Sequence, residues 1–180
     1  MLKRGLIAIA FSLIVWGCGT STQQGTGSQS DRGEAPVILD YYAAETIRPG
    51  ATWRVYLHAK DNDGDMRDVA SVLFQRGHRP YPTAVTTIDR ENAGEVAGYL
   101  FLRTPVDRNL WRNRFNLRVI VRDSQGNRSE AVEIPLRFGN VPPAETPEKW
   151  AEFADRSLGA LQIRIQSSEE RTRTSGGRRR

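Results

Sequence analysis

Three groups of side chains in this sequence have a type and spacing that suit chemistry: one thiol, one cluster of carboxylates and one stripe of guanidinium groups. The thiol is Cys18, the single cysteine among 180 residues, and it ends an apolar run that follows Lys3 and Arg4. One cysteine excludes an intramolecular disulfide, so the fold has to be stable through packing alone. A thiol with no partner cysteine is a candidate for another covalent modification.

The first eighteen residues have the shape of a secretory signal. Their apolar run, Gly5 to Gly17, is too short to cross about 30 Å of hydrocarbon. Its end, Val15-Trp16-Gly17-Cys18, resembles the cleavage box of bacterial lipoproteins, although Trp16 stands where that family has Ala, Ser or Thr. The resemblance implies that Cys18 is acylated, becomes the new N-terminus and anchors the chain, since each buried methylene contributes about 0.8 kcal/mol. An uncleaved N-terminal anchor and an ordinary signal peptide with an accidental cysteine are the alternatives.

The residue after the cysteine bears on location. It is Gly19, and an Asp there would signal retention in the inner membrane in the enteric members of the lipoprotein family. We therefore expect an exported protein, held by lipid on the outer membrane. The expected partners are the membrane itself and envelope proteins, and export argues against a nucleic acid. The sequence leaves the oligomeric state open.

The carboxylate cluster is Asp61-Asn62-Asp63-Gly64-Asp65. Oxygen ligands on a tight turn suit a hard cation such as calcium, with Asp61, Asp63 and Asp65 as the candidate ligands. The spacing does not fit an EF-hand loop, because Met66 and Val72 stand where that loop has its glycine and its bidentate glutamate. The alternative is a solvated turn whose Asp side chains accept hydrogen bonds from nearby backbone N–H groups.

The guanidinium stripe runs through residues 103–122, close to Trp111. Such a stripe can bind a polyanion, for example lipopolysaccharide or an acidic glycan. A solvated outer strand face, with acidic residues interleaved, is the alternative. The candidate polyanion-binding residues are Arg112, Arg114, Arg118 and Arg122.

Catalytic patterns do not emerge from the remaining residue types. The two histidines, His58 and His78, are twenty positions apart and lack the spacing of a transition-metal site. The sequence contains no Gly-x-Ser-x-Gly elbow, phosphate loop or dinucleotide fingerprint. We therefore expect no enzymatic activity and no cofactor, with calcium as the one ion that the aspartate cluster leaves open.

The elements that carry these residues are short strands. Residues 19–34 are rich in Gly, Ser, Thr and Gln and predict a flexible tether, whereas residues 35–139 alternate between apolar and polar side chains with the period of a half-buried strand. Turn residues separate the alternating runs at regular intervals, which predicts an all-β, seven-stranded antiparallel sandwich. The expected strands are 37–43, 53–60, 69–75, 84–89, 97–103, 115–121 and 132–138. Pro135 has no N–H, so we expect its strand to be an edge or to bulge there.

Two stretches carry a family resemblance. "HAKDNDGDMRDV" at residues 58–69 and "VIVRDSQGNRSEAVEI" at residues 119–134 resemble bacterial immunoglobulin-like domains of the fibronectin or cadherin-like kind. In that family an Asp-rich turn leads out of the second strand, and an Asp-x-x-Gly-Asn turn joins the last two. The resemblance implies an immunoglobulin-like sandwich over residues 35–139, and it implies no particular function.

Residues 140–170 predict a proline-containing hinge and an amphipathic helix. Thr146-Pro147-Glu148 has the pattern of a helix start, and apolar residues follow at a spacing near 3.6. Three placements of this helix are open: on its own sandwich, on a partner or on a membrane. The arginine-rich end, residues 171–180, is expected to be disordered. The candidate partner-binding residues are Trp150, Phe153, Leu158 and Leu161.

These patterns leave two hypotheses of function. The first is a membrane-anchored, non-enzymatic envelope lipoprotein that offers a binding or assembly surface. The second is a recognition module for an anionic envelope glycan or lipopolysaccharide, which binds through the arginine-rich strand face.

Overall fold

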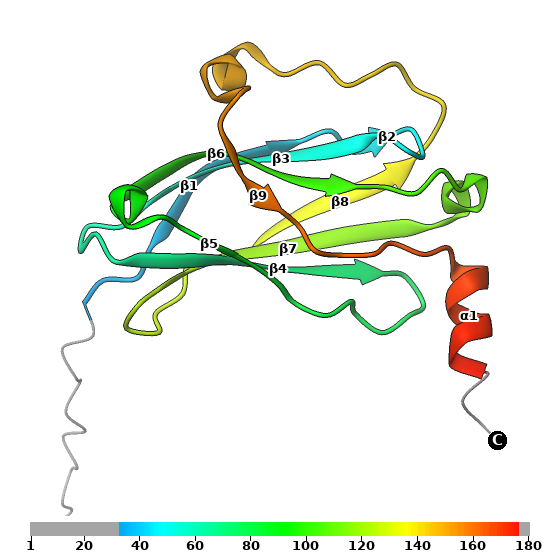
Figure 1. The fold of residues 1–180 in the computed structure, drawn as a ribbon, viewed down its shortest axis with the longest axis horizontal. Helices are drawn as coiled ribbons and strands as arrows, with labels where there is room; N and C mark the ends of the chain where they lie inside the picture. The colour runs from blue at the N-terminus through cyan, green and yellow to red at the C-terminus, as the bar shows by residue number, and fades with distance from the viewer. Residues whose placement is uncertain (1–32, 177–180) are drawn as a thin grey trace, which may run out of the picture. The chain divides into compact units, whose positions relative to one another are not determined.

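The structure, a computed structural model, describes residues 33–176 as an all-β sandwich of two sheets (Figure 1). Cys18 and the signal lie outside the described residues, as does most of the tether. The strands are β1 (Val37–Ala43), β2 (Thr46–Ile47), β3 (Thr52–Lys60), β4 (Met66–Gln75), β5 (Ala84–Thr87), β6 (Glu95–Arg103), β7 (Arg114–Asp123), β8 (Val132–Phe138) and β9 (Ser157–Ala160). One sheet has the order β1-β3-β6-β9, and the other has the order β2-β8-β7-β4-β5.

Alternation of apolar and polar side chains explains the longest strands. In β3 the side chains of Trp53, Val55 and Leu57 point into the core and are at most 1% exposed. β7 and β8 repeat the pattern, so the inner faces of the two sheets pack against each other. All seven predicted strands are present at or close to the expected residues, and the prediction of an all-β sandwich is confirmed.

The strand order matches an immunoglobulin-like arrangement. The first, second and fifth of the seven predicted strands (β1, β3, β6) form one sheet, while the third, sixth and seventh (β4, β7, β8) lie in the other. The seven strands pair antiparallel with one another. β2 adds a short parallel pairing to β8 at Arg137 and Phe138 only, which leaves β8 an edge strand at Pro135, as predicted.

The segment after Gly139 differs from the prediction, because the expected amphipathic helix is not formed. A short 3₁₀ helix, η3 (Glu148–Phe153), is followed by β9, which pairs in parallel with β6. Gly159 has φ 141°, outside the helical region, and its Cα approaches Thr86 so closely that a side chain would not fit. The sandwich therefore extends well beyond residue 139.

Residues 161–165 continue from β9 as an extended segment. Leu161, Ile163 and Ile165 are 4%, 7% and 3% exposed and belong to the core, while Gln162 and Arg164 face the solvent. Their alternation has a period of two, so an extended chain buries all three apolar side chains where a helix would bury fewer. This burial is the physical reason that the segment is extended.

The helix α1 (Ser168–Gly176) follows. Arg171 holds it to the sandwich: its guanidinium lies 4.2 Å from the ring centre of Tyr81 and donates hydrogen bonds to Gln75 Oε1 (3.0 Å) and to the carbonyl of Arg79 (2.9 Å). The disorder expected from Arg171 onward is therefore wrong for the residues of α1, and residues 177–180 lie outside the described part. No helix within residues 33–176 has the length and apolar character needed to span a membrane.

The two outer faces of the sandwich differ. Residues 142–156 cross the outer face of the four-stranded sheet (Figure 1), where Trp150 packs on Tyr56 with 5.4 Å between ring centres and on Phe153 with 5.9 Å. The outer face of the five-stranded sheet is open to solvent in the described structure. Its residues include Val85, which is 51% exposed, and the exposed Pro135.

Candidate functional site

The aspartate cluster forms a hydrogen-bonded turn between β3 and β4. Asp61 is 4% exposed and its carboxylate accepts the backbone N–H groups of Asp63 (3.4 Å) and Asp65 (3.2 Å). Burial raises the pKa of Asp61, and its interaction with the nearby Asp65 carboxyl raises it further. Asp63 instead accepts the backbone N–H of Glu34. These contacts match the turn chemistry that was the alternative to calcium.

A second aspartate turn lies beside the first. The Asp123 carboxylate is fully buried and accepts the backbone N–H groups of Gln125 (3.0 Å) and Asn127 (2.7 Å). The two turns are joined, because Ser124 donates its backbone N–H to the carbonyl of Asp65 at 3.0 Å. The Asp61 and Asp123 carboxylates therefore stabilise the backbone of their turns.

In residues 33–176, no group of three or more His, Cys, Asp or Glu side chains is arranged to hold a metal ion. Calcium at Asp61, Asp63 and Asp65 stays a prediction. His58, the histidine nearest this end, is paired with Glu95 at 2.8 Å.

The predicted arginine stripe is divided by ion pairs. Arg118 pairs with Glu133 (2.5 Å) across the β7–β8 ladder, and Arg122 pairs with Asp68 (2.6 Å) across the β7–β4 ladder. Arg112 and Arg114 are exposed and make no ion pair within the described residues. The four arginines therefore do not present one continuous free stripe.

Asp68 is the acidic residue most enclosed by arginine. It is 5% exposed and also pairs with Arg67 at 2.8 Å. Burial alone would raise the pKa of Asp68, but the hydrogen bonds from Arg122 and Arg67 outweigh it, and the pKa lies below its ordinary value.

Replacing this carboxylate is expected to destabilise the protein. Asp68→Asn removes the charge-assisted bonds, so its free energy of unfolding should fall by about 2 kcal/mol at neutral pH. Because the folded pKa is lowered, the wild-type advantage is complete above the ordinary Asp pKa of about 3.9 and disappears as the pH falls through the folded value. Urea unfolding of both proteins at several pH values measures the difference. An equal difference at every pH would contradict the ion-pair explanation.

The predicted partner-binding residues are divided between core and surface. Trp150 and Leu161 are 2% and 4% exposed, so their apolar surface is already buried within this chain. Phe153 and Leu158 are half-buried. These residues do not form one face of a helix, because η3 ends at Phe153 and β9 contains Leu158. Trp150 and Leu161 are consequently core residues rather than a docking surface.

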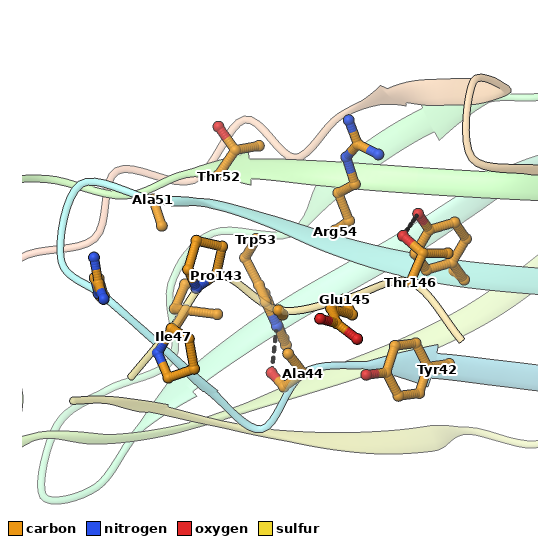
Figure 2. A pocket seen from close by; sticks show the side chains of 14 residues that line it. Tyr42, Ala44, Ile47, Ala51, Thr52, Trp53, Arg54, Pro143, Glu145 and Thr146 are labelled. Atoms are coloured by element: carbon orange, nitrogen blue, oxygen red, sulfur yellow. Dashed lines mark hydrogen bonds between the residues drawn. The ribbon is translucent and has the colours of Figure 1, made fainter. Parts of the chain in front are cut away.

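A cavity of about 220 Å³ lies beside the crossing segment (Figure 2). The Tyr56 and Thr146 hydroxyl groups are 3.0 Å apart at one side of it, and the indole Nε1 of Trp53 donates to the carbonyl of Ala44 at 2.8 Å. Small-molecule pockets usually occupy about 300 Å³ or more. This cavity is therefore smaller than most small-molecule pockets, and two of its aromatic residues already make hydrogen bonds within the chain. Its lining comprises Tyr42, Ala44, Ile47, Arg48, Ala51, Thr52, Trp53, Arg54, Tyr56, Pro142, Pro143, Ala144, Glu145 and Thr146.

The outer face of the five-stranded sheet is not covered by any other segment of the described residues, as the exposure of Val85, Arg118 and Pro135 shows. At its centre the Arg118 guanidinium lies 5.1 Å from the ring centre of Phe74, and Ile120 and Val72 are half-buried beside it. The arginines of β7 were among the residues predicted from the sequence, whereas their apolar neighbours on β4 were not. The available signal was the alternation of β4, in which Val72 and Phe74 fall on the side opposite to Leu73.

Comparison with known proteins finds distant structural similarity only. Neither a protein-family model nor a curated protein sequence matches this chain. One similar solved structure is the PKD domain of an M14-like peptidase from Thermoplasmatales archaeon SCGC AB-540-F20, at 12% identity and TM-score 0.38, covering 60% of this chain and 99% of that one. Another, from human seminal plasma, is the complex of zinc 2-glycoprotein and prolactin-inducible protein, at 10% identity and TM-score 0.33, covering 57% and 96%.

A third is a CARDB domain from Pyrococcus furiosus, solved in complex with di-metal ions. It shares 11% identity with a TM-score of 0.30 and covers 58% of this chain and 86% of that one. All three likenesses are distant, with identities of 10–12% and TM-scores below 0.4.

Proposed function

We propose that this protein is a non-enzymatic binding module of the bacterial cell envelope, anchored by lipid at Cys18, and that the open face of its five-stranded sheet contacts the partner. One observation carries the choice of face. The chain covers the outer face of its four-stranded sheet with residues 142–156, while Val85, Arg118 and Pro135 of the other face remain exposed. A chain that covers one face with its own residues 142–156 leaves the second face available to another molecule.

The polar side chains support a role without catalysis. The buried carboxylates Asp61 and Asp123 accept backbone N–H groups, and Asp68 is neutralised by two arginines. His58 pairs with Glu95 on the outer side of the four-stranded sheet. Each of these groups has a partner that explains it structurally, and a general base or nucleophile needs a different arrangement.

The anchor has a direct test. Cys18→Ser removes the acceptor for lipid. Stable attachment to a membrane needs more than one acyl chain, and the variant would carry none. We therefore expect the protein to move from the membrane fraction to the soluble fraction. Labelled fatty acid should join the wild-type chain and not the variant. Should the variant stay in the membrane fraction, or the wild type take up no label, Cys18 would not be the anchor.

The binding face is tested by photo-crosslinking in native membranes. A crosslinking amino acid at position 135 lies on the five-stranded sheet, and one at position 60 lies on the four-stranded sheet; both positions are exposed strand residues. We expect a defined product from position 135 and none from position 60. The reverse pattern would place the partner on the other face and overturn this proposal.

A second candidate function is recognition of an anionic envelope glycan. The observation in its favour is that Arg112 and Arg114 remain exposed without an ion pair in the described structure, although Arg118 and Arg122 are paired. Such a module would lose affinity steeply as salt is raised. A partner held by apolar contacts at Val72 and Phe74 would not.

A further inference from the structure

We propose that Arg76, Arg114 and Arg137 form a binding line for an anionic polysaccharide, one that carries a carboxylate, phosphate or sulfate on successive sugar rings. The proposal rests on the second candidate function and specifies its site and its ligand. The row crosses the ends of three neighbouring strands, whereas the stripe predicted from the sequence follows a single stretch of the chain.

The strand register places these arginines side by side. Arg114 is the direct cross-strand partner of Arg137 in the β7–β8 ladder. On the other side of Arg114, Gln75 pairs with Phe115 at the end of β4, and Arg76 donates its backbone N–H to the carbonyl of Arg114 at 3.0 Å. All three side chains are exposed, while the next residues, Gln75 and Phe115, are buried. Arg114 and Arg137 therefore lie on the outer face of the sheet, and the exposed Arg76 lies beside Arg114 in the turn that follows β4.

No carboxylate neutralises this row within the described structure. The salt bridges of the β4–β7–β8 region involve Arg67, Arg118 and Arg122, not the arginines of the row. Glu133, the acid on the same face of β8, bonds to Arg118 and Asn116. Like charges directly opposite each other in a ladder are destabilising. An anionic ligand along the row would relieve this repulsion.

The shape of the row indicates a linear ligand. Neighbouring strands are about 4.8 Å apart, so the backbones of three neighbouring arginines span about 10 Å. Side chains on one face of a sheet stand roughly parallel, so the groups do not converge on a single point. A lone phosphate would meet one or two of them, while a chain of anionic groups would meet all three.

The adjacent row favours a sugar over a nucleic acid. It contains Phe74, Asn116 and Pro135, which follow from the same pairings. Single-stranded nucleic acids bind through aromatic rings on which their bases stack. The ring of Phe74 already has the Arg118 guanidinium over it at 5.1 Å. Pro135 offers an exposed apolar surface of the size of a sugar ring instead.

The experiment is a titration of the full-length protein, in a neutral detergent, with fluorescein-labelled dextran sulfate and polygalacturonate. We expect binding that weakens steeply between about 50 and 200 mM salt, and no binding of neutral dextran. Each Arg→Gln change in the row should weaken binding about fivefold, and the triple variant about a hundredfold. The matched control is Arg90→Gln/Arg103→Gln/Arg164→Gln, which removes three exposed arginines from elsewhere and should retain binding.

The melting temperature distinguishes a ligand-binding role of these arginines from a structural one. Because the arginines repel one another, Arg114→Gln should raise the melting temperature at low salt by about 2 °C, and the rise should vanish in high salt. Equal loss in both triple variants would overturn the proposal, because it would show a general effect of net charge. Tighter binding of oligo-dT than of either polysaccharide would overturn the choice of ligand. If the row fails while the crosslink from position 135 persists, the proposed face stands and only the glycan is excluded.

Discussion

A chain that ends at Gly139 is expected not to fold, even though it contains all seven strands predicted from the sequence. The missing segment contributes Leu161, Ile163 and Ile165 to the core, and β9 covers the free edge of β6. Truncating one buried Leu or Ile costs about 2–5 kcal/mol, and a typical domain has only about 5–15 kcal/mol of stability. Losing all three side chains therefore removes most or all of the stability.

Circular dichroism and thermal unfolding of the truncated chain measure this effect. The control ends at Ser167, which keeps β9 and the three core residues and removes α1. We expect the control to unfold cooperatively, a few degrees below the whole protein, because it loses the contacts of Arg171 with Tyr81 and Gln75. A cooperative transition in the chain that ends at Gly139 would show that the sandwich is complete without its C-terminal segment.

The second large effect concerns Trp150. We expect Trp150→Ala to lower the free energy of unfolding by about 3 kcal/mol, because the indole is 2% exposed and packs on Tyr56 and Phe153. Trp111→Ala is the matched control: Trp111 is 52% exposed, so its change should lie within about 0.5 kcal/mol. Urea unfolding measures both.

A third substitution separates the loss of aromatic packing at position 150 from the loss of the indole N–H. The buried Nε1–H of Trp150 has no acceptor from the described protein, so Trp150→Phe keeps an aromatic ring and removes an uncompensated polar group. We expect it to be much less destabilising than the alanine change. Equal, small effects of Trp150→Ala and Trp111→Ala would instead mean that Trp150 is available to a partner, as the sequence analysis suggested.

The strands were predictable because each shows its pattern locally. Residues 53–60 and 132–138 alternate with period two, and β3 and β8 lie there. β2 was missed because two residues carry no periodicity, and its pairing with β8 depends on chain far away in the sequence. Strand existence is thus a local property, while sheet order and added edge strands depend on distant segments.

The amphipathic helix expected within residues 140–170 was a wrong prediction, because its apolar residues fit both a helical period and a strand period. Trp150, Phe153, Leu158 and Leu161 fall near one helical face, yet Leu161 also begins the period-two series that continues at Ile163. Packing between the sheets decided in favour of the extended form. Gly159 was the residue that could have indicated it.

The candidate site was only partly predictable for a similar reason. Alternation correctly places Arg114, Arg118 and Arg122 on one side of β7. Which arginines are neutralised depends on the residues opposite them, Glu133 and Asp68, and these follow from the register of neighbouring strands. A single sequence does not contain that register. The Asp61 turn was predictable, because its hydrogen bonds join residues two and four positions apart.

The parallel pairing of β9 with β6 has a consequence for when the domain matures. One layer of its interior comes from β9 and from Leu161, Ile163 and Ile165, so a nascent polypeptide cannot complete its core until those residues have been made. Long-range pairing of this kind also slows folding. Export of the kind proposed above would benefit from such a delay, since a chain has to stay unfolded until a translocation channel has released it.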